Sequence, residues 1–275
     1  MVEQKQRETE KPRGDADMRH RILVMSGKGG VGKTTIAVNL ALSLSMTGVQ
    51  VGMLDADLHG PNVPKMLGMS DSFPLVAPGD DGLLEPAYAT PKLAIVSMDL
   101  LMPNKDQPVI WRGPLKMKAL EQLLRETRWG KLEYLVVNLP PGTGDESLSA
   151  AQLTEADAAI IVTTPQEVAL LDSRKAITFA KDLKIPHIGV IENMSGMLCP
   201  HCGKEIDLFG TGGGERAARE MGVKFLGRIP VYPQIVANGD SGKPSVLNGE
   251  IKEKLGFDKI TMEIEKMFTD NGGEK

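Results

Sequence analysis

Residues 26–35 read SGKGGVGKTT and contain Gly27-x-x-x-x-Gly32-Lys33-Thr34, the pattern of a phosphate-binding loop. Glycines allow successive backbone N–H groups to turn inward and approach phosphate oxygens closely. We expect Lys33 to reach the β- and γ-phosphates of a nucleotide, and Thr34 to offer its hydroxyl to Mg²⁺. The residues predicted to bind the nucleotide in this loop are Gly27, Lys28, Gly29, Gly30, Val31, Gly32, Lys33, Thr34 and Thr35.

The sequence on either side of the loop supplies the context that the motif requires. Residues 21–25 (RILVM) predict a short buried strand, and residues 35–46 (TIAVNLALSLSM) predict a helix. The positive end of that helix would face the phosphates. The alternative is a glycine-rich turn without a ligand, and the flanking strand and helix argue against it.

Lys28 directly follows the first glycine of the motif, where most phosphate loops have no cation. Two lysines this close would crowd each other unless Lys28 points away from Lys33. We therefore expect Lys28 to point toward the nucleotide of another subunit.

The bulk composition narrows the classes of protein. The chain has 275 residues, a net charge of −4 and 41% apolar residues, which suit one large α/β domain or two small ones. No strong positive field is available for nucleic acid or anionic lipid. No apolar run approaches the roughly 18 residues of a membrane helix, and no signal-peptide pattern is present. We therefore expect a cytoplasmic protein that binds neither nucleic acid nor membrane.

Predicted strands and helices alternate along the chain. The strands are expected at residues 49–54, 83–88, 93–98, 134–139, 158–163, 187–192 and 224–229. The helices are expected at residues 115–128, 147–153, 167–183, 215–221, 231–239 and 251–268. This alternation predicts an α/β fold with a mostly parallel sheet and helices on both faces. We expect residues 1–20 to be a disordered lead and residues 21–275 to form a single domain.

Polar residues follow several of the predicted strands. Asp55 and Asp57 follow the strand at 49–54, and the carboxyl ends of parallel strands face the ligand crevice. Asp55 is a candidate to hold an Mg²⁺-bound water, and Asp57 to orient or deprotonate the attacking water. The alternative is an Asp turn that ends the strand. Asn193 is a candidate contact for a nucleotide base, with a turn-forming residue as its alternative.

Two further segments contain residues of functional interest. The proline- and glycine-rich residues 140–145 are suited to a loop that moves when a γ-phosphate leaves. Trp111 suits the core or an interface, and Arg112 is either a surface charge or a dimer contact.

Cys199 and Cys202 are the two cysteines of the chain, and their Cys-x-x-Cys spacing predicts a metal or redox pair. One pair cannot complete a four-thiolate site. Three interpretations remain: a redox-active pair, a Zn²⁺ site shared by two subunits, and a [4Fe–4S] cluster that bridges two subunits. His201 is a possible further ligand, although its place inside the turn favours a ring that points to solvent.

Seven strings together resemble the Mrp/ApbC family of cytosolic P-loop ATPases, which act as iron–sulfur cluster carriers. They are GKGGVGKTT, DADLHGPN, IWRGP, NLPPGTGD, ENMSG, CPHCG and Ile229-Pro230. The similarity runs from Arg21 to Phe268. DADLHGPN and PPGTGD with a later Cys-x-x-Cys are specific to this family, and the loop is similar to the deviant phosphate loop of the MinD/nitrogenase iron-protein group.

The resemblance implies a homodimer that binds ATP and Mg²⁺ at its interface. It also implies a [4Fe–4S] cluster that Cys199 and Cys202 of each subunit bridge and that is passed to apo-proteins. Lys33, Thr34, Asp55 and Asp57 carry over to the nucleotide and Mg²⁺ roles. Lys28 carries over to the interface lysine, and Asn193 to the adenine contact.

Two departures from the family pattern change these expectations. The chain lacks the N-terminal cysteine cluster and accessory domain of some relatives, so only the bridging cluster is expected. Asn138 stands where the family usually has aspartate, which leaves ATP binding intact and predicts slow hydrolysis.

Two other functions compete with the carrier. One is a positioning ATPase of the MinD/ParA type, which needs a membrane or DNA surface. The balanced charges of residues 251–268 argue against a basic membrane helix. The other is a zinc-stapled dimer that binds nucleotide only as a structural ligand.

Overall fold

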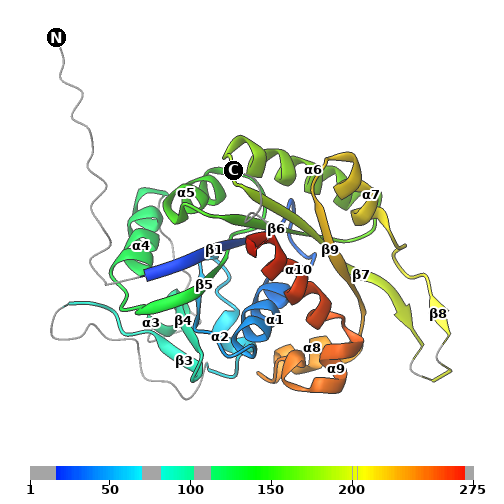
Figure 1. Ribbon diagram of the computed structural model, residues 1–275, viewed down its shortest axis with the longest axis horizontal. Coiled ribbons are helices and arrows are strands. Elements are labelled where there is room, and N and C mark those ends of the chain that lie inside the picture. Colours follow the sequence, from blue (N-terminus) through cyan, green and yellow to red (C-terminus); the bar gives the residue numbers. More distant parts are fainter. Residues whose placement is uncertain (1–16, 70–81, 102–112, 200, 203, 270–275) are drawn as a thin grey trace, which may run out of the picture.

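A single twisted sheet runs through the part of the chain that the structure, a computed structural model, describes: residues 17–69, 82–101, 113–199, 201–202 and 204–269 (Figure 1). Its strand order is β3-β4-β2-β5-β1-β6-β7-β8, and β9 also pairs with β7. The strands are β1 (Asp17–Met25), β2 (Val51–Asp55), β3 (Ala87–Thr90), β4 (Leu93–Ser97), β5 (Lys131–Asn138), β6 (Ala158–Thr163), β7 (His187–Leu198), β8 (Glu205–Ile206) and β9 (Lys224–Val231). The pairings of β3 with β4 and of β7 with β8 are antiparallel, and the others are parallel. The α/β class with a mostly parallel sheet is therefore confirmed.

Helices cover both faces of this sheet (Figure 1). One layer holds α1 (Lys33–Ser45), α2 (Val63–Met66), α8 (Pro233–Asp240), α9 (Gly249–Lys254) and α10 (Phe257–Thr269), with a short 3₁₀ helix at Ser245–Leu247. The opposite layer holds α4 (Gly113–Arg125), α5 (Asp145–Thr154), α6 (Glu167–Asp182) and α7 (Gly213–Glu220). The short α3 (Met98–Leu101) follows β4.

The alternating side chains of β1 show how the two layers form. Ile22 and Val24 pack into the core beneath α1 and α10, whereas Leu23 and Met25 pack into the core beneath α4, α5 and α6. Successive side chains of a strand point to opposite faces, so a strand that is covered on both faces must be apolar at every position. This explains the continuous apolar runs that predicted the central strands.

Most of the expected elements are confirmed within a few residues, and three predictions are wrong. The strand β1 begins at Asp17, so residues 17–20 belong to the sheet and not to the lead. Asp17 and Met18 pair with Lys131 and Leu132 of β5 through the backbone, which does not require apolar side chains. Residues 1–16 lie outside the described residues.

The other two errors concern residues 83–88 and 251–268. Only Ala87 and Tyr88 of the first range belong to a strand, while Leu84 forms an isolated bridge with Thr127. The predicted helix at 251–268 is two helices, α9 and α10, which are separated at Gly256. Gly256 has a φ of +71°, a left-handed conformation that ends α9.

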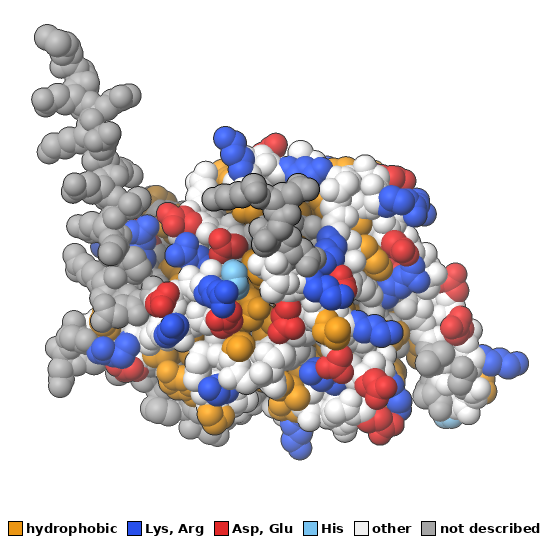
Figure 2. Space-filling model, viewed as in Figure 1, with side chains coloured by type: hydrophobic (Ala, Val, Ile, Leu, Met, Phe, Trp, Pro, Cys, Tyr) orange, Lys and Arg blue, Asp and Glu red, His pale blue; other side chains and the backbone are white. Residues whose placement is uncertain are grey.

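No helix in the described ranges is long and apolar enough to span a membrane. On the face shown in Figure 2, basic and acidic side chains are interspersed over the surface. That face therefore carries no extended field of a single sign.

Candidate nucleotide site and cysteine arm

The predicted phosphate-binding loop connects β1 to α1, as the motif requires. Gly30 and Gly32 have φ angles of +81° and +84°, which glycine adopts at little cost. Gly32 is also the N-cap of α1, so the first N–H groups of the helix border the loop. A curved loop at the N-terminus of a helix is suited to binding phosphate.

The helix α6 supports the loop from one side. A Cβ atom added to Gly27 would lie 2.2 Å from the backbone C and O atoms of Asp172 in α6. Backbone atoms cannot move aside as a flexible side chain does. The first glycine of the motif is therefore required by the close approach of α6.

Lys33 and Asn138 form the centre of a buried polar network. Lys33 Nζ donates to Asn138 Oδ1 at 2.7 Å, and the Lys33 side chain is 6% exposed. Burial lowers the pKa of Lys33, while the carboxylates of Asp57 and Asp55 act in the opposite direction. Asp57 Oδ2 lies 3.9 Å from Lys33 Nζ. The lysine that should reach the phosphates thus lies against the groups expected to handle the metal and water.

The two predicted Mg²⁺ ligands converge on the amide of Asn138. Asn138 Nδ2 donates to Asp55 Oδ1 at 2.9 Å and to Thr34 Oγ1 at 3.4 Å. Burial raises the pKa of Asp55 to about 6, and the hydrogen bonds from Asn138 and from Val63 N oppose this rise. A carboxylate and a hydroxyl are oxygen ligands of the kind Mg²⁺ prefers, so this donor set fits the metal. Asp55 and Thr34 would hold it.

Asn193 of β7 also lies against the phosphate-binding loop. Its Nδ2 atom donates to Val31 O at 2.8 Å, and the residue is 6% exposed. A Cβ atom at Gly32 would lie 2.2 Å from the same nitrogen. The structure therefore brings Asn193 to the nucleotide loop, and its contact with adenine stays a prediction.

Lys28 differs from Lys33 in its surroundings. Its side chain makes no hydrogen bond or ion pair within the described part of the chain, and only its carbonyl is used, as the acceptor for Ser26 Oγ at 2.9 Å. The role across a subunit interface stays a prediction. Trp111 and Arg112 lie outside the described residues.

The loop after β5 lies beside the phosphate loop. Gly142 N donates to Ser26 O at 2.9 Å, which joins the proline- and glycine-rich residues 140–145 to the start of the motif. The sequence predicted a movable loop near the γ-phosphate, and this contact brings the segment to the loop that would bind the phosphates.

One polar cluster was not predicted from the sequence. Lys116 of α4 donates to Glu146 Oε1 of α5 at 2.5 Å and also contacts His59 Nε2. Glu146 Oε1 lies 3.3 Å from His59 Nε2. The cluster joins the loop after β2 to α4 and α5. His59 belongs to the DADLHGPN motif, but the sequence around it does not indicate that Lys116 and Glu146, far along the chain, are its partners.

Both cysteines lie on a hairpin that projects from the body of the molecule (Figure 1). We call residues 197–211 the cysteine arm. Met197 pairs with Ile206 and Leu198 with Glu205, and Cys199 N donates to Lys204 O at 2.8 Å. The arm is therefore a hairpin whose turn contains the Cys-x-x-Cys motif.

The two thiols are free, Cys199 half-buried and Cys202 exposed. Hydrogen bonds from the backbone of Cys202 and His201 lower the pKa of the Cys199 thiol, which favours the thiolate that binds metals. No group of three His, Cys, Asp or Glu residues suited to a metal occurs among the described residues. The two thiols of the arm are half of the number that a four-thiolate site requires.

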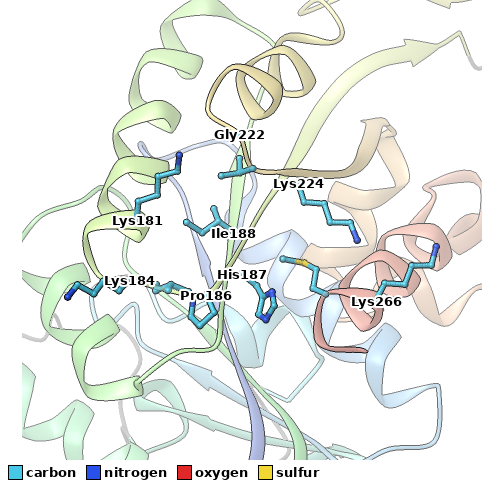
Figure 3. Close-up of a pocket in the computed structure, with 11 residues that line it drawn as sticks. Lys181, Lys184, Pro186, His187, Ile188, Gly222, Lys224 and Lys266 are labelled. Atoms are coloured by element: carbon cyan, nitrogen blue, oxygen red, sulfur yellow. The ribbon is translucent and has the colours of Figure 1, made fainter. Parts of the chain in front are cut away.

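A hollow lies at the end of the sheet where β7 and β9 begin (Figure 3). It has a volume of about 520 Å³ and is lined by Lys181, Lys184, Lys224 and Lys266 near the starts of β7 and β9. Lys181 Nζ donates to Met221 O at 2.5 Å, and Lys224 and Lys266 both pair with Glu263. Three of these lysines therefore already have partners within the protein. The hollow lies at the start of β7, whereas the phosphate-binding loop contacts Asn193 further along this strand, so the hollow is separate from the nucleotide site.

Comparison with known proteins resolves the family. A family model of the ParA group, described as the NUBPL iron-transfer P-loop NTPase, matches residues 17–265. The chain belongs to this family.

Several curated relatives have names that describe iron–sulfur transfer. The chain is 49% identical to an iron-sulfur cluster carrier protein from Methanocaldococcus jannaschii, over 90% of this chain and 84% of the relative. It is 45% identical to a carrier of the same name from Pyrococcus horikoshii, over 99% and 94% of the two chains. It is 44% identical to a cytosolic Fe-S cluster assembly factor NUBP2 homolog from Nematostella vectensis, over 84% and 87%.

Solved structures of related proteins share the fold. A nucleotide-binding protein from Archaeoglobus fulgidus in complex with ADP is 34% identical, with a TM-score of 0.74 over 86% of this chain and 92% of the other. The cell division ATPase MinD from Pyrococcus furiosus is 25% identical, with a TM-score of 0.65 over 91% and 100% of the two chains. The P-loop NTPase fold is thus confirmed.

Proposed function

We propose that this protein is an ATP-binding iron–sulfur cluster carrier. Two copies would hold one [4Fe–4S] cluster between their cysteine arms and deliver it to apo-proteins. The observation that carries the proposal is a pair of free, accessible thiols on a projecting hairpin of a P-loop NTPase from an iron-transfer family. Relatives that share nearly half of their residues with this chain are named carriers.

The chemistry of the nucleotide site supports ATP as the ligand. Backbone N–H groups of the loop and the Lys33 ammonium would bind the phosphates, and Asp55 and Thr34 would hold Mg²⁺. Asp57 is half-buried beside Lys33, and it would orient a water for attack on the γ-phosphate. The Archaeoglobus protein, which shares this fold, was solved in complex with ADP, and this supports nucleotide binding by the present chain.

A second copy of the chain would complete the cluster site. A [4Fe–4S] cluster takes four thiolates, and each chain has two. Three apolar side chains of the same arm are also exposed: Ile206, Leu208 and Phe209 are 40%, 51% and 37% exposed. Exposed apolar groups of this size suit a protein contact. We also propose a cytoplasmic location, because the Nematostella relative is named a cytosolic factor.

The test is reconstitution of the purified protein with iron and sulfide in the absence of oxygen. We expect broad visible absorption, and four irons for every two chains. Cys199→Ala or Cys202→Ala should abolish stable cluster binding and leave ATP affinity nearly intact, because the arm and the phosphate loop are separate elements. Lys33→Ala is the matched control, which should lose ATP binding and retain the cluster.

Two outcomes would contradict the proposal. A full cluster on either cysteine variant would show that the pair does not bridge two chains. Zinc alone after reconstitution would instead support a zinc-stapled dimer.

A further inference from the structure

Glu192 is a fully buried carboxylate at the point where β7 leaves the core of the sheet. Its Oε1 atom accepts from Ser195 Oγ at 2.5 Å and from Gly212 N at 2.7 Å, and its Oε2 atom accepts from Gly214 N. The guanidinium of Arg228 approaches Oε1 to 3.9 Å. Burial of a carboxylate is costly unless it is hydrogen-bonded, so these contacts hold the surrounding backbone in place.

The partners of Glu192 lie on both sides of the cysteine arm. Ser195 precedes the arm, whereas Gly212 and Gly214 follow it at the start of α7. A single carboxylate therefore closes the base of the hairpin that carries both cysteines. Glu192 is not part of the buried polar network around Lys33 and Asn138.

The next residue in the strand contacts the nucleotide loop. Asn193 Nδ2 donates to Val31 O at 2.8 Å. Neighbouring side chains of a strand point to opposite sides, so Glu192 holds the base of the arm while Asn193 holds the phosphate loop. Asn193 is six residues from Cys199, a span of at most about 20 Å in extended chain.

The backbone between these contacts and the arm is irregular. Met194 and Gly196 have φ angles of +56° and +68°. The register of β7 with β9 shifts between Asn193 and Met197. A non-glycine residue with positive φ is uncommon and marks a local constraint. Because the pairing of β7 with β9 is irregular here, no regular hydrogen-bond ladder is present to take up a movement at Asn193.

We propose that Glu192 is a positioning residue that couples nucleotide binding to the cysteine arm. When a nucleotide fills the loop, Val31 and Asn193 adjust together, and Glu192 passes the adjustment to Gly212 and Gly214 at the base of the arm. The proposal rests on the proposed function in that the nucleotide and the thiols serve one task. It concerns this chain's own residues and needs no bound cluster.

The test uses the accessibility of the thiols. The chain has two cysteines, both on the arm, so alkylation by iodoacetamide reports on the arm alone. The full-length, reduced, metal-free protein is alkylated without nucleotide, with Mg·ADP and with Mg·ATP, and intact mass gives the rates. Nucleotide affinity is measured separately by calorimetry. In the unaltered protein we expect nucleotide to change the rate by at least about fivefold, the low end of typical coupling between sites.

Glu192→Gln is the variant of choice because it keeps the side-chain size. A glutamine can direct its oxygen toward only one side, and its NH₂ group then opposes an N–H donor. We expect Glu192→Gln to bind nucleotide normally, with alkylation rates that differ by less than about twofold between nucleotide states. Glu167→Gln is the control, because Glu167 is exposed, lies on α6 and pairs with Arg216 outside the arm. It should behave as the unaltered protein.

Each result decides the question. Full coupling in a folded Glu192→Gln protein with normal nucleotide affinity would overturn the proposal. Absence of any nucleotide effect in the unaltered protein would also overturn it, and the metal analysis of the carrier function would be unaffected. If Glu192→Gln fails to fold, Ser195→Ala removes one of the donors to Glu192. It should then reduce the nucleotide effect, and an undiminished effect would contradict the proposal.

Discussion

At the scale of single residues, Asn138 does something that an aspartate cannot do in the nucleotide-free protein. It accepts a hydrogen bond from Lys33 at 2.7 Å and donates one to Asp55 at 2.9 Å. An ionised carboxylate only accepts, so an aspartate here would face Asp55 as a like charge. The amide therefore satisfies this network without a metal, whereas a second carboxylate would need a cation between the two.

We predict that Asn138→Asp raises the steady-state rate of ATP hydrolysis by at least about tenfold, with little change in nucleotide affinity. The added charge should orient and polarise the water ligands of Mg²⁺. The same change should lower the melting temperature of the nucleotide-free protein, because two buried carboxylates would then lie side by side. Mg·ATP should restore it. ATPase assays at several Mg²⁺ concentrations and thermal melts measure both effects.

Asn138→Ala is the control for this prediction. It removes the amide contacts and adds no charge, so it should destabilise the protein without increasing turnover. Equal hydrolysis rates for the unaltered protein and the Asn138→Asp variant at every Mg²⁺ concentration would show that Asp55 and Thr34 are sufficient for the metal.

At the scale of elements, the position of α6 explains why the phosphate loop begins with glycine. Gly27 has no left-handed φ, and its backbone conformation is open to other residues. The constraint is the space beside Asp172 of α6. Gly29 lies two residues further on, is exposed, and has nothing within 4 Å of the Cβ position.

These two glycines form a matched pair. Gly27→Ala should destabilise the nucleotide-free protein by roughly 1–3 kcal/mol, the usual effect of forcing a methyl group into filled space. For a chain of this size, each kcal/mol lowers the melting temperature by about 2–4 °C. Gly29→Ala should leave the melting temperature unchanged. Similar melting temperatures for the two variants would mean that α6 moves aside freely, and would contradict the packing argument.

At the scale of the whole molecule, Lys28 bears on assembly. Lys33 is buried and bound to Asn138, whereas Lys28 is half-buried and has no side-chain partner in the described residues. A cation without a partner in that part of the chain, beside the proposed nucleotide site, is suited to act on the nucleotide of a second copy.

We predict that Lys33→Ala abolishes nucleotide binding, while Lys28→Ala mainly reduces hydrolysis. Lys33 would contact the phosphates of its own subunit's nucleotide throughout the reaction, and Lys28 would stabilise charge that develops on the partner's nucleotide as the γ-phosphoryl group departs. The crossing is tested by mixing Lys28→Ala with Asp57→Asn, a subunit that should bind ATP without hydrolysing it. Each mixed dimer would regain one complete site, so about a quarter of the full activity should return at statistical mixing. Two inactive proteins that stay inactive together would place Lys28 on its own nucleotide.

The local sequence was sufficient for the features that neighbouring residues encode. The phosphate loop, its strand and its helix are contiguous, so their glycines, apolar residues and helix-forming run predict one another. The alternation of buried strands with helices predicted the parallel sheet, because only strands covered on both faces are apolar throughout. The Cys-x-x-Cys turn was predicted for the same reason, since its two thiols are close in sequence.

The network around Asn138 was decided by the tertiary structure. The strand β5 lies between β2 and β1, and Asn138 pairs in register with Asp55 on one side and Val24 on the other. This order brings residues 33, 55 and 138 together although long segments separate them. The contact of Gly27 with α6 and the closure of the cysteine arm by Glu192 arise in the same way. Local sequence encodes backbone conformation and the period of burial, whereas strand order and register decide which distant side chains meet.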